Sequence, residues 1–452
     1  MNDKIIQRNI IPDIFKFIER KEILIIKGPR QSGKTTLLEM LTKKLIEERG
    51  VNPDNIIYLT FDNTPILESF EKDPIPLIRS FTLNLSGQIY ILLDEIQRSK
   101  SAGLNLKLIY DTFKNIKFIA TGSSSLEIES NIESYLVGRV FSYILLNFEF
   151  QEFLRTKPAN FYNHYIEASN NIKSFITGDK FKEKFEFLFT DKFLDFLNEF
   201  ITFGGYPEVV KTEQVEIKME ILRNIYETYL TKDIIETLQM GNVSSYRKLV
   251  LILANQIGNL TNYHSLLQDT GCYFALLKKY IDILENTYII KSIKPFYINE
   301  ANAIRKNPKI YFLDSGLRNS MLGNFTNIGI RPDNGQLIEN YILTQLLKSY
   351  FKYGAYLNPE GNNVRFWRTT SGTEVDFVLN LESESIISKK QAQNMIPIEA
   401  KFSKITKPSI SRSFRSYLNT YNPERALILT KDYFELTKIN NTKLLFCPIW
   451  AI

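Results

Sequence analysis

Residues 28–35 read Gly-Pro-Arg-Gln-Ser-Gly-Lys-Thr and have the spacing of a phosphate-binding loop, or P-loop. The two glycines let the backbone curl so that successive amide groups point at one phosphate. We therefore expect Lys34 to contact the β- and γ-phosphates of ATP, and the Thr35 hydroxyl to bind Mg²⁺. The predicted nucleotide-binding residues are Gly28, Pro29, Arg30, Gln31, Ser32, Gly33, Lys34, Thr35 and Thr36.

An acidic pair follows an apolar run further along the chain. Residues 89–93 read Ile-Tyr-Ile-Leu-Leu, and Asp94 and Glu95 come directly after them. In α/β proteins, ligands bind at the carboxyl ends of the parallel strands. We predict that Asp94 holds Mg²⁺ and that Glu95 polarises the water that attacks the γ-phosphate. The alternative is a strand that simply meets solvent, but the upstream P-loop favours the catalytic interpretation.

Two further residues are candidates for sensing or stabilising the nucleotide. Ser123 follows the apolar run 116–120, where a hydroxyl can sense the γ-phosphate. The hydroxyls of Ser124 and Ser125 are alternatives, and any of the three could instead cap the next helix. Arg139 could neutralise transition-state charge, in cis or from a neighbouring subunit. A surface arginine at a helix end is an equally good explanation of Arg139.

A second set of chemically competent residues lies near the C-terminus. Glu339 lies in a helical pattern, Asp376 in one strand-like run, and Glu399 and Lys401 in another. Residues two apart on a strand face the same side, so Glu399 and Lys401 should project together. We expect the three carboxylates to bind Mg²⁺ or Mn²⁺ and the lysine to activate water for phosphodiester cleavage. The alternative is a decayed site whose charges form surface ion pairs.

The elements that must position the first site alternate along the chain. Continuous apolar runs at 22–27, 55–61, 89–93 and 116–120 are separated by helical stretches. Such alternation is typical of a parallel sheet with helices on both faces. The predicted fold class is therefore α/β, with a P-loop NTPase sheet at its centre.

The middle of the chain is predicted to contain a helical linker and a winged helix. The Gly-Gly-Tyr-Pro stretch at 204–207 marks a boundary or hinge. On DNA, the third helix of the module would place Lys278 and Lys279 near phosphates or base edges. Acidic neighbours also allow a module that contacts protein instead. The three helical units and the β-wing are expected at 244–257, 261–269, 272–288 and 289–297.

Length and composition limit the remaining possibilities. The 452 residues are enough for two to four domains, and their 44% hydrophobic and 23% charged shares are typical of globular proteins. No apolar run reaches the roughly 20 residues of a membrane span, and no signal-peptide core follows the N-terminus. Two cysteines and two histidines argue against a disulfide framework or a zinc site and favour the cytoplasm. The net charge of +6 permits contact with nucleic acid but does not argue for it.

Taken together, these motifs resemble those of archaeal and bacterial AAA-type P-loop ATPases related to the signal-transduction ATPases. The resemblance implies ATP binding, slow hydrolysis, a winged helix and a C-terminal domain similar to PD-(D/E)xK restriction endonucleases. One departure is that no proline precedes Asp376. The residues that carry the resemblance are 28–36, 92–97, 120–125, 204–208, 311–318 and 374–377.

The predicted domains are an ATPase core with a helical extension (1–205), a helical linker with a winged helix (206–330) and an endonuclease-like domain (331–452). One hypothesis is a Mg²⁺-dependent ATPase that is coupled to DNA binding or processing and gates a metal-dependent nuclease. The other is a nucleotide-driven switch or assembly scaffold whose nuclease-like domain is inactive and binds a partner. DNA and a second copy of the chain are the macromolecular partners under consideration.

Overall fold

The computed structural model describes residues 5–123, 132–228, 243–298, 306–350, 363–381 and 391–452. They form two compact units, the first made mainly of residues up to 148 and the second mainly of the residues after it. The helices between 150 and 203 belong to the second unit, whereas the sequence groups them with the ATPase core. Within the described ranges, no helix combines the length and apolar character needed to cross a bilayer.

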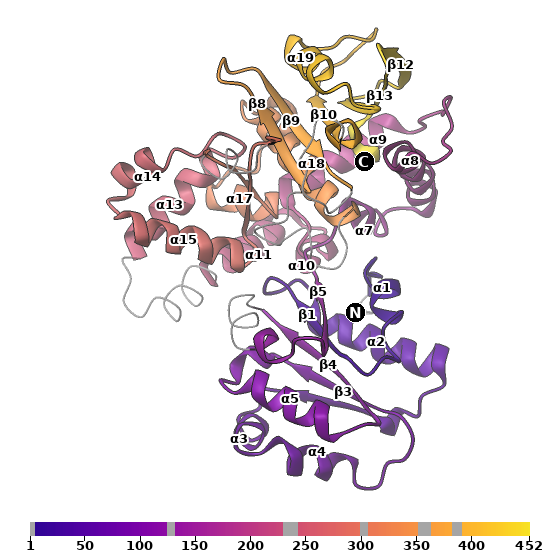
Figure 1. The fold of residues 1–452 in the computed structure, drawn as a ribbon, viewed down its shortest axis with the longest axis vertical. Helices are drawn as coiled ribbons and strands as arrows, with labels where there is room; N and C mark the ends of the chain where they lie inside the picture. The colour runs from indigo at the N-terminus through magenta and orange to yellow at the C-terminus, as the bar shows by residue number, and fades with distance from the viewer. Residues whose placement is uncertain (1–4, 124–131, 229–242, 299–305, 351–362, 382–390) are drawn as a thin grey trace. The chain divides into compact units, whose positions relative to one another are not determined.

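The first unit is built on a five-stranded parallel sheet with the strand order β2-β3-β4-β1-β5 (Figure 1). Its strands are β1 (Ile23–Lys27), β2 (Ile56–Thr60), β3 (Ile89–Asp94), β4 (Ile116–Gly122) and β5 (Val140–Ile144). Every residue of β1, β3 and β4 is buried, which explains their continuous apolar sequences. Because all neighbouring strands are parallel, their carboxyl ends meet at one edge of the sheet.

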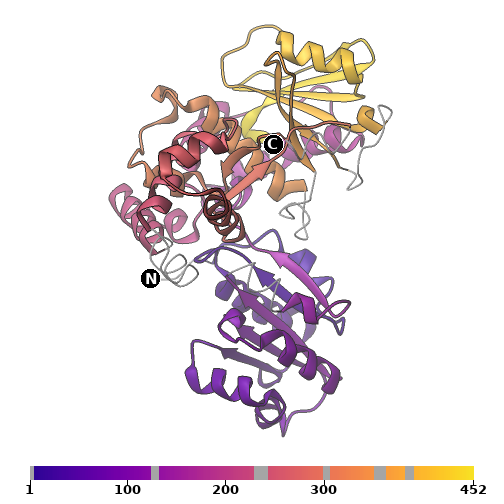
Figure 2. The same ribbon diagram turned by 60° about the vertical axis from the view of Figure 1, so that its left-hand side comes forward.

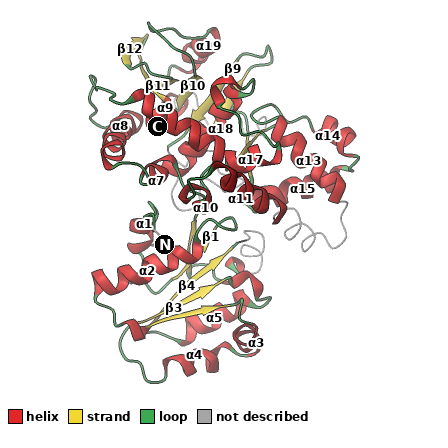
Figure 3. Cartoon of the chain, turned by 180° about the vertical axis from the view of Figure 1, so that it is seen from behind, coloured by secondary structure: helices red, strands yellow, loops and turns green. Residues whose placement is uncertain are grey.

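Helices cover both faces of this sheet, as Figures 1 and 3 show. The helices are α1 (Ile11–Phe15), α2 (Lys34–Arg49), α3 (Thr64–Lys72), α4 (Pro74–Thr82) and α5 (Ala102–Thr112). Leu24 and Ile26 pack in the core that contains α1 and α2. Ile23 and Ile25 point to the other face and pack in the core that contains α3, α4 and α5. The alternation along β1 thus supplies two separate apolar layers.

The second unit begins with helices and ends in a mixed sheet. Three helices, α13, α14 and α15, precede the antiparallel pair β6–β7, which is the order predicted for the winged helix. The winged-helix assignment itself stays a prediction. The elements of this region are α7 (Phe150–Leu154), α8 (Ala159–Thr177), α9 (Thr190–Phe203), α10 (Pro207–Lys211), α11 (Val215–Thr228), α13 (Val243–Asn255), α14 (Tyr263–Thr270), α15 (Phe274–Asn286), β6 (Ile290–Ile293), β7 (Lys309–Phe312) and α17 (Ser315–Met321).

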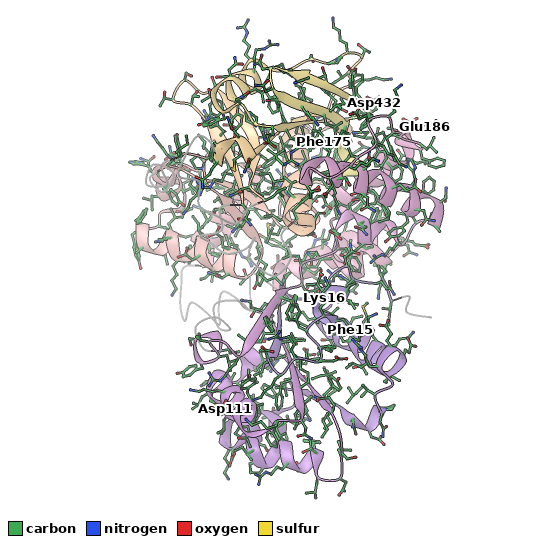
Figure 4. The ribbon with its side chains drawn as sticks, turned by 45° about the vertical axis from the view of Figure 1, so that its right-hand side comes forward. Phe15, Lys16, Asp111, Phe175, Glu186 and Asp432 are labelled. Atoms are coloured by element: carbon green, nitrogen blue, oxygen red, sulfur yellow. The ribbon has the colours of Figure 1, made fainter. Side chains whose placement is uncertain are left out.

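The C-terminal part contains a six-stranded sheet with the order β12-β13-β11-β10-β9-β8. Helix α19 covers one face of it, where Phe414 and Tyr417 enter the core (Figure 2). Phe175 of α8 lies beside this domain, and its carbonyl accepts a 3.4 Å hydrogen bond from Nη1 of Arg425 (Figure 4). The elements are α18 (Asn334–Tyr350), β8 (Val364–Arg368), β9 (Glu374–Leu379), β10 (Ile396–Lys401), α19 (Arg412–Tyr421), β11 (Arg425–Thr430), β12 (Glu435–Ile439) and β13 (Thr442–Pro448). Short 3₁₀ turns lie at Pro53–Asn55, Ile96–Arg98, Glu133–Tyr135, Ile328–Ile330, Gln391–Asn394 and Ile449–Ala451.

Two motifs that are distant in sequence meet inside the second unit. Asp314 begins α17, and its Oδ1 accepts a 2.9 Å hydrogen bond from the amide of Leu317. Its Oδ2 accepts another, also 2.9 Å long, from the amide of Gly205. The neighbouring Gly204 has φ +75°, and a Cβ there would lie 2.1 Å from Oδ1 of Asp314. Asp314 and the glycine pair therefore have a structural role.

Candidate functional site

The P-loop joins β1 to α2 through a backbone that requires glycine. Gly33 lies at the helix start with φ +88°, in the left-handed region. At Gly28, an added Cβ would lie 2.2 Å from the carbonyl oxygen of Leu145, so a side chain is excluded by backbone. Helix α2 begins at Lys34, and the amides of its first turn lie at the carboxyl edge of the sheet. The loop therefore has the local structure of an anion-binding site.

Lys34 is held against the loop that it is predicted to serve. Its side chain is buried, and Nζ donates hydrogen bonds to the carbonyls of Gly28 at 3.2 Å and Pro29 at 2.8 Å. These contacts keep the ammonium group at the loop, where an incoming phosphate would find it. The arrangement fits the predicted role of Lys34.

The fold brings together Thr35 of the P-loop and Asp94 of the acidic pair. Oγ1 of Thr35 donates a 2.8 Å hydrogen bond to Oδ2 of Asp94, which also accepts a 2.7 Å bond from the hydroxyl of Tyr58. Thr121 donates to the other carboxylate oxygen. Burial raises the pKa of Tyr58, and the adjacent Asp94 raises it further. A hydroxyl and a carboxylate this close are oxygen donors of the kind that Mg²⁺ prefers, so these residues fit the predicted metal.

Glu95 and Ser123 are linked by a residue that the sequence analysis missed. Nε2 of Gln97 donates to the carboxylate of Glu95 and, at 2.9 Å, to Oγ of Ser123. Oε1 of Gln97 also accepts a 3.3 Å bond from the amide of Ser123. The sequence signal was available, since Gln97 ends the motif at 92–97, but nothing in the spacing indicated its partners. The alternatives Ser124 and Ser125 lie outside the described residues.

A second missed residue, Arg8, supports the P-loop from the N-terminal segment. Its guanidinium donates to the carbonyl of Ser32 at 2.8 Å and to that of Leu146 at 2.5 Å. It also lies 4.8 Å from the centroid of the Phe148 ring, within cation–π range. Arg8 is buried although it precedes the loop by 20 residues, and no motif spacing points to it.

Arg139 lies at the end of the parallel sheet opposite the P-loop. It directly precedes β5, and its carbonyl accepts a 2.8 Å hydrogen bond from Ile23, the first residue of β1. The P-loop follows the other end of β1, roughly 16 Å away for five residues at ~3.3 Å each. The Arg139 side chain pairs with Asp111, 3.3 Å away at the end of α5 (Figure 4). A role of Arg139 at the nucleotide, in cis or from a neighbouring subunit, stays a prediction.

In the C-terminal domain, Glu339 is engaged by groups that the sequence analysis did not consider. Its Oε2 accepts a 3.1 Å hydrogen bond from the hydroxyl of Tyr311 and lies 3.7 Å from Nζ of Lys309. Lys309 also forms an ion pair with Glu374, which in turn pairs with Arg368 at 2.6 Å. Burial raises the pKa of Glu339 to about 7, and the charge of the nearby carboxylate on β9 adds to the shift.

The other predicted nuclease residues each have a protein partner. Oδ2 of Asp376 accepts a 2.8 Å bond from the amide of Ala400, and Glu399 accepts a 3.1 Å bond from the hydroxyl of Ser411. Burial raises the pKa of both carboxyl groups. Nζ of Lys401 donates to a backbone carbonyl at 2.8 Å.

The described part of the chain contains no group of three or more His, Cys, Asp or Glu residues arranged to hold a metal ion. The metal site predicted at Glu339, Asp376 and Glu399 stays a prediction. Each of the three carboxylates accepts at least one hydrogen bond from within the protein.

Three family models match consecutive parts of the chain. Residues 20–154 match an AAA domain. Residues 194–327 and 334–450 match two domains of unknown function, DUF8612 and DUF4143. The AAA match covers the P-loop, the acidic strand and all five strands of the parallel sheet.

Sequence similarity to two other proteins extends over most of the chain. An uncharacterized protein of Haemophilus influenzae is 23% identical over 99% of this chain and 98% of its own length. An uncharacterized protein of Methanocaldococcus jannaschii is 26% identical over 85% of this chain and 77% of its own length.

Solved structures with similarity to this chain include two that contain nucleotide. ORC2 of Aeropyrum pernix in its ADP form has a TM-score of 0.32 and 13% identity, over 62% of this chain and 84% of that chain. DnaA of Aquifex aeolicus with AMPPCP has a TM-score of 0.28 and 13% identity, over 61% of this chain and 86% of that chain. Scores this low carry no argument about function. The P-loop geometry, the parallel sheet and the match to the AAA domain support an AAA-type P-loop ATPase core in the first unit.

Proposed function

We propose that the protein binds and hydrolyses ATP at the carboxyl edge of the parallel sheet in its first unit. The observation that carries this proposal is the 2.8 Å contact between Oγ1 of Thr35 and Oδ2 of Asp94. It joins the P-loop to the acidic strand at the point where a triphosphate and its metal would be held.

Each residue of the site has a distinct proposed role. Lys34 exchanges its bonds to the loop carbonyls for contacts with the β- and γ-phosphates. Thr35 and Asp94 would hold Mg²⁺, which when bound supplies positive charge against the charge that develops on the phosphoryl oxygens. The amides of the P-loop and of the first turn of α2 orient the phosphate chain.

Glu95 is the proposed base that orients and polarises the attacking water. Gln97 is a positioning residue, because its amide holds the carboxylate of Glu95 and contacts Ser123. Through that amide, a change at Ser123 when the γ-phosphate is present or absent would reach the base. The three side chains therefore form one sensing and catalytic unit.

An assay of phosphate release distinguishes ATP hydrolysis from nucleotide binding alone. Glu95→Gln should retain ATP binding but lose most turnover, because the neutral amide cannot accept the proton of water. Glu68→Gln is the matched control, since Glu68 is an exposed residue of the same unit. A Glu95→Gln protein that hydrolyses ATP at the wild-type rate would overturn the assignment of the base.

We further propose that the nucleotide state is coupled to DNA through the helical module in residues 243–312. Lys278 and Lys279 are exposed on α15, while Tyr280 anchors this helix with an edge-on ring contact 5.1 Å from Tyr246. Exposed lysines on the third helix of such a module suit contact with the phosphate backbone.

The DNA proposal is tested by the salt dependence of duplex binding. Lys278→Ala combined with Lys279→Ala should weaken binding and reduce the slope of log K against log salt by about 2. Lys438→Ala combined with Lys443→Ala is the matched control, because these lysines are exposed and opposite each other on β12 and β13. Equal weakening by both pairs would remove the module from the proposed interface.

A second candidate function is a nucleotide-driven switch or scaffold whose C-terminal domain binds a partner without cutting nucleic acid. Hydrogen bonds within the chain favour this function over metal-dependent cleavage, because they already engage Glu339, Asp376, Glu399 and Lys401. Incubation of the wild-type protein with branched, single-stranded and duplex DNA plus Mg²⁺ or Mn²⁺ should give no cleavage. Cleavage that Lys401→Ala abolishes would restore the nuclease hypothesis.

A further inference from the structure

A buried ammonium group lies inside the acidic region of the C-terminal domain. Lys309 is the first residue of β7, and its side chain is only 4% exposed. Pairing of β7 with β6 fixes its backbone, with Lys309 opposite Ile293. Because β7 belongs to a separate two-stranded sheet, this lysine reaches the C-terminal domain from a neighbouring element.

Two carboxylates from different elements converge on this lysine. Nζ forms an ion pair with Glu374 of β9 and lies 3.7 Å from Oε2 of Glu339 on α18. Asp376 lies two residues further along β9, on the same side as Glu374, and its charge also acts on the lysine. A buried charge requires such partners, since desolvation would otherwise destabilise it strongly. The same holds in reverse, because the carboxylates need a cation between them.

Lys309 and the carboxylates of Glu339 and Glu374 line a polar pocket. A cavity of about 300 Å³ is lined by Lys309, Glu339 and Glu374, together with Arg368 and the 258–260 turn. Gly258 has φ +74°, and a Cβ there would lie 3.3 Å from the ring of Tyr311 and 3.5 Å from the carboxylate of Glu339. Because Gly258 has no side chain, the cavity stays open beside the carboxylate of Glu339. Hydrated ions therefore have room to approach the two carboxylates.

We propose that Lys309 is a resident counter-cation that keeps divalent metal out of the Glu339–Glu374 pair. Mg²⁺ and Mn²⁺ are commonly bound by one or two carboxylates with water completing the shell, and this pocket provides two carboxylates and a cavity beside them. The ammonium group occupies the position between the carboxylates, so a second cation is repelled. Without its charge, the pair would take up one divalent ion. This inference deepens the second candidate function, the domain that does not cut, and is independent of ATP hydrolysis.

The occupancy of the site is measured by titrating nucleotide-free, full-length protein with Mn²⁺ and following the free-ion signal by electron paramagnetic resonance. Lys309→Met should bind one more Mn²⁺ per chain than the wild type. Lys309→Arg, which keeps the charge, and Lys443→Met, an exposed lysine on β13, should bind as the wild type does. Adding Glu374→Gln to Lys309→Met should remove the extra ion. A folded Lys309→Met protein that binds no additional Mn²⁺ would overturn the proposal.

A second comparison keeps the proposal testable if Lys309→Met does not fold. Wild type and Glu339→Gln should bind the same number of Mn²⁺ ions, because the lysine already excludes metal from this carboxylate. Loss of an ion in Glu339→Gln would show that the wild-type site holds metal, and the proposal would fail. Because no nucleotide is present, neither result depends on whether the first unit hydrolyses ATP.

Discussion

Oγ1 of Thr35 and Oδ2 of Asp94, 59 residues apart in sequence, lie 2.8 Å from each other. Thr35 lies in the first turn of α2, which follows β1, and Asp94 ends β3; the two strands are not neighbours, because β4 lies between them in the sheet. The contact therefore depends on the parallel arrangement, which brings the carboxyl ends of several strands to one edge. Binding of phosphate and metal at this edge of the sheet is the central feature of the proposed function.

Gln97→Leu should lower kcat for ATP hydrolysis by roughly 10- to 100-fold while changing KM little. The apolar side chain cannot hold the carboxylate of Glu95 or contact Ser123, whereas the phosphate-binding residues stay intact. Steady-state kinetics with Gln88→Leu as the exposed-glutamine control would measure this split. A large rise in KM with unchanged kcat would place Gln97 in nucleotide binding instead.

Arg8→Ala should destabilise the first unit by about 2–4 kcal/mol, because charged hydrogen bonds to two buried carbonyls are lost. The affinity for ATP should fall as well, since one of those carbonyls, on Ser32, is in the P-loop. Urea denaturation and nucleotide titration would measure the two effects. Arg20→Ala, which removes an exposed arginine paired with Glu22, should cost much less, because solvent screens this pair. Equal losses for the two variants would contradict the supporting role of Arg8.

Much of the nucleotide site was predictable because its motifs are local. Residues 28–35 specify both the glycine-dependent turn and the start of α2, and Asp94 ends its own buried strand. The position of Arg139 was also readable in principle. A residue that directly precedes a parallel strand must lie at the amino edge, opposite the P-loop.

The residues that sequence reasoning missed act through tertiary contacts. Arg8 and Lys309 reach carbonyls or carboxylates on elements far from them in sequence, and no period or spacing encodes such pairs. The alternation of Glu399 and Lys401 on β10 was sound, but their partners come from the segment after the strand. A motif therefore gave the strand and the residue types but not the electrostatic state of the site.

Gly204→Ala should destabilise the protein more than Gly323→Ala does. Both glycines have positive φ, +75° and +62°. Gly204 also has ψ −167°, a combination that is essentially restricted to glycine, so an alanine there adds backbone strain of about 1–3 kcal/mol. Only at Gly204 would the new Cβ meet Asp314, 2.1 Å away, whereas nothing lies within 4 Å at Gly323. Overpacking should add about 1–3 kcal/mol. Denaturant midpoints that shift equally would show that the contact between the two motifs is readily relaxed.

Acid should weaken the second unit through Asp333. Its carboxylate is bound by Arg331 at two 2.8 Å contacts and by Arg318 at 2.6 Å. The Arg331 hydrogen bonds, followed by those of Arg318, lower the pKa of Asp333 to about 2. The ionised carboxylate therefore stabilises the fold above the ordinary aspartate pKa of about 4, and this contribution is lost as the pH falls from there toward 2.

The Asp333 contribution is isolated by comparing wild type with Asp333→Asn. The difference between their urea midpoints should be largest at pH 6 and should shrink by pH 3. A difference that is constant over this range would mean that the aspartate contributes through its shape and not through its charge.

Isothermal titration calorimetry with Mg²⁺ and ATP tests the proposed nucleotide site most directly. The wild-type protein should bind one nucleotide per chain, and Lys34→Ala should lose most of that affinity. Lys43→Ala, which removes a 72% exposed lysine from the same helix, should bind as the wild type does. No saturable heat with the wild type, or unchanged affinity in Lys34→Ala, would contradict the account.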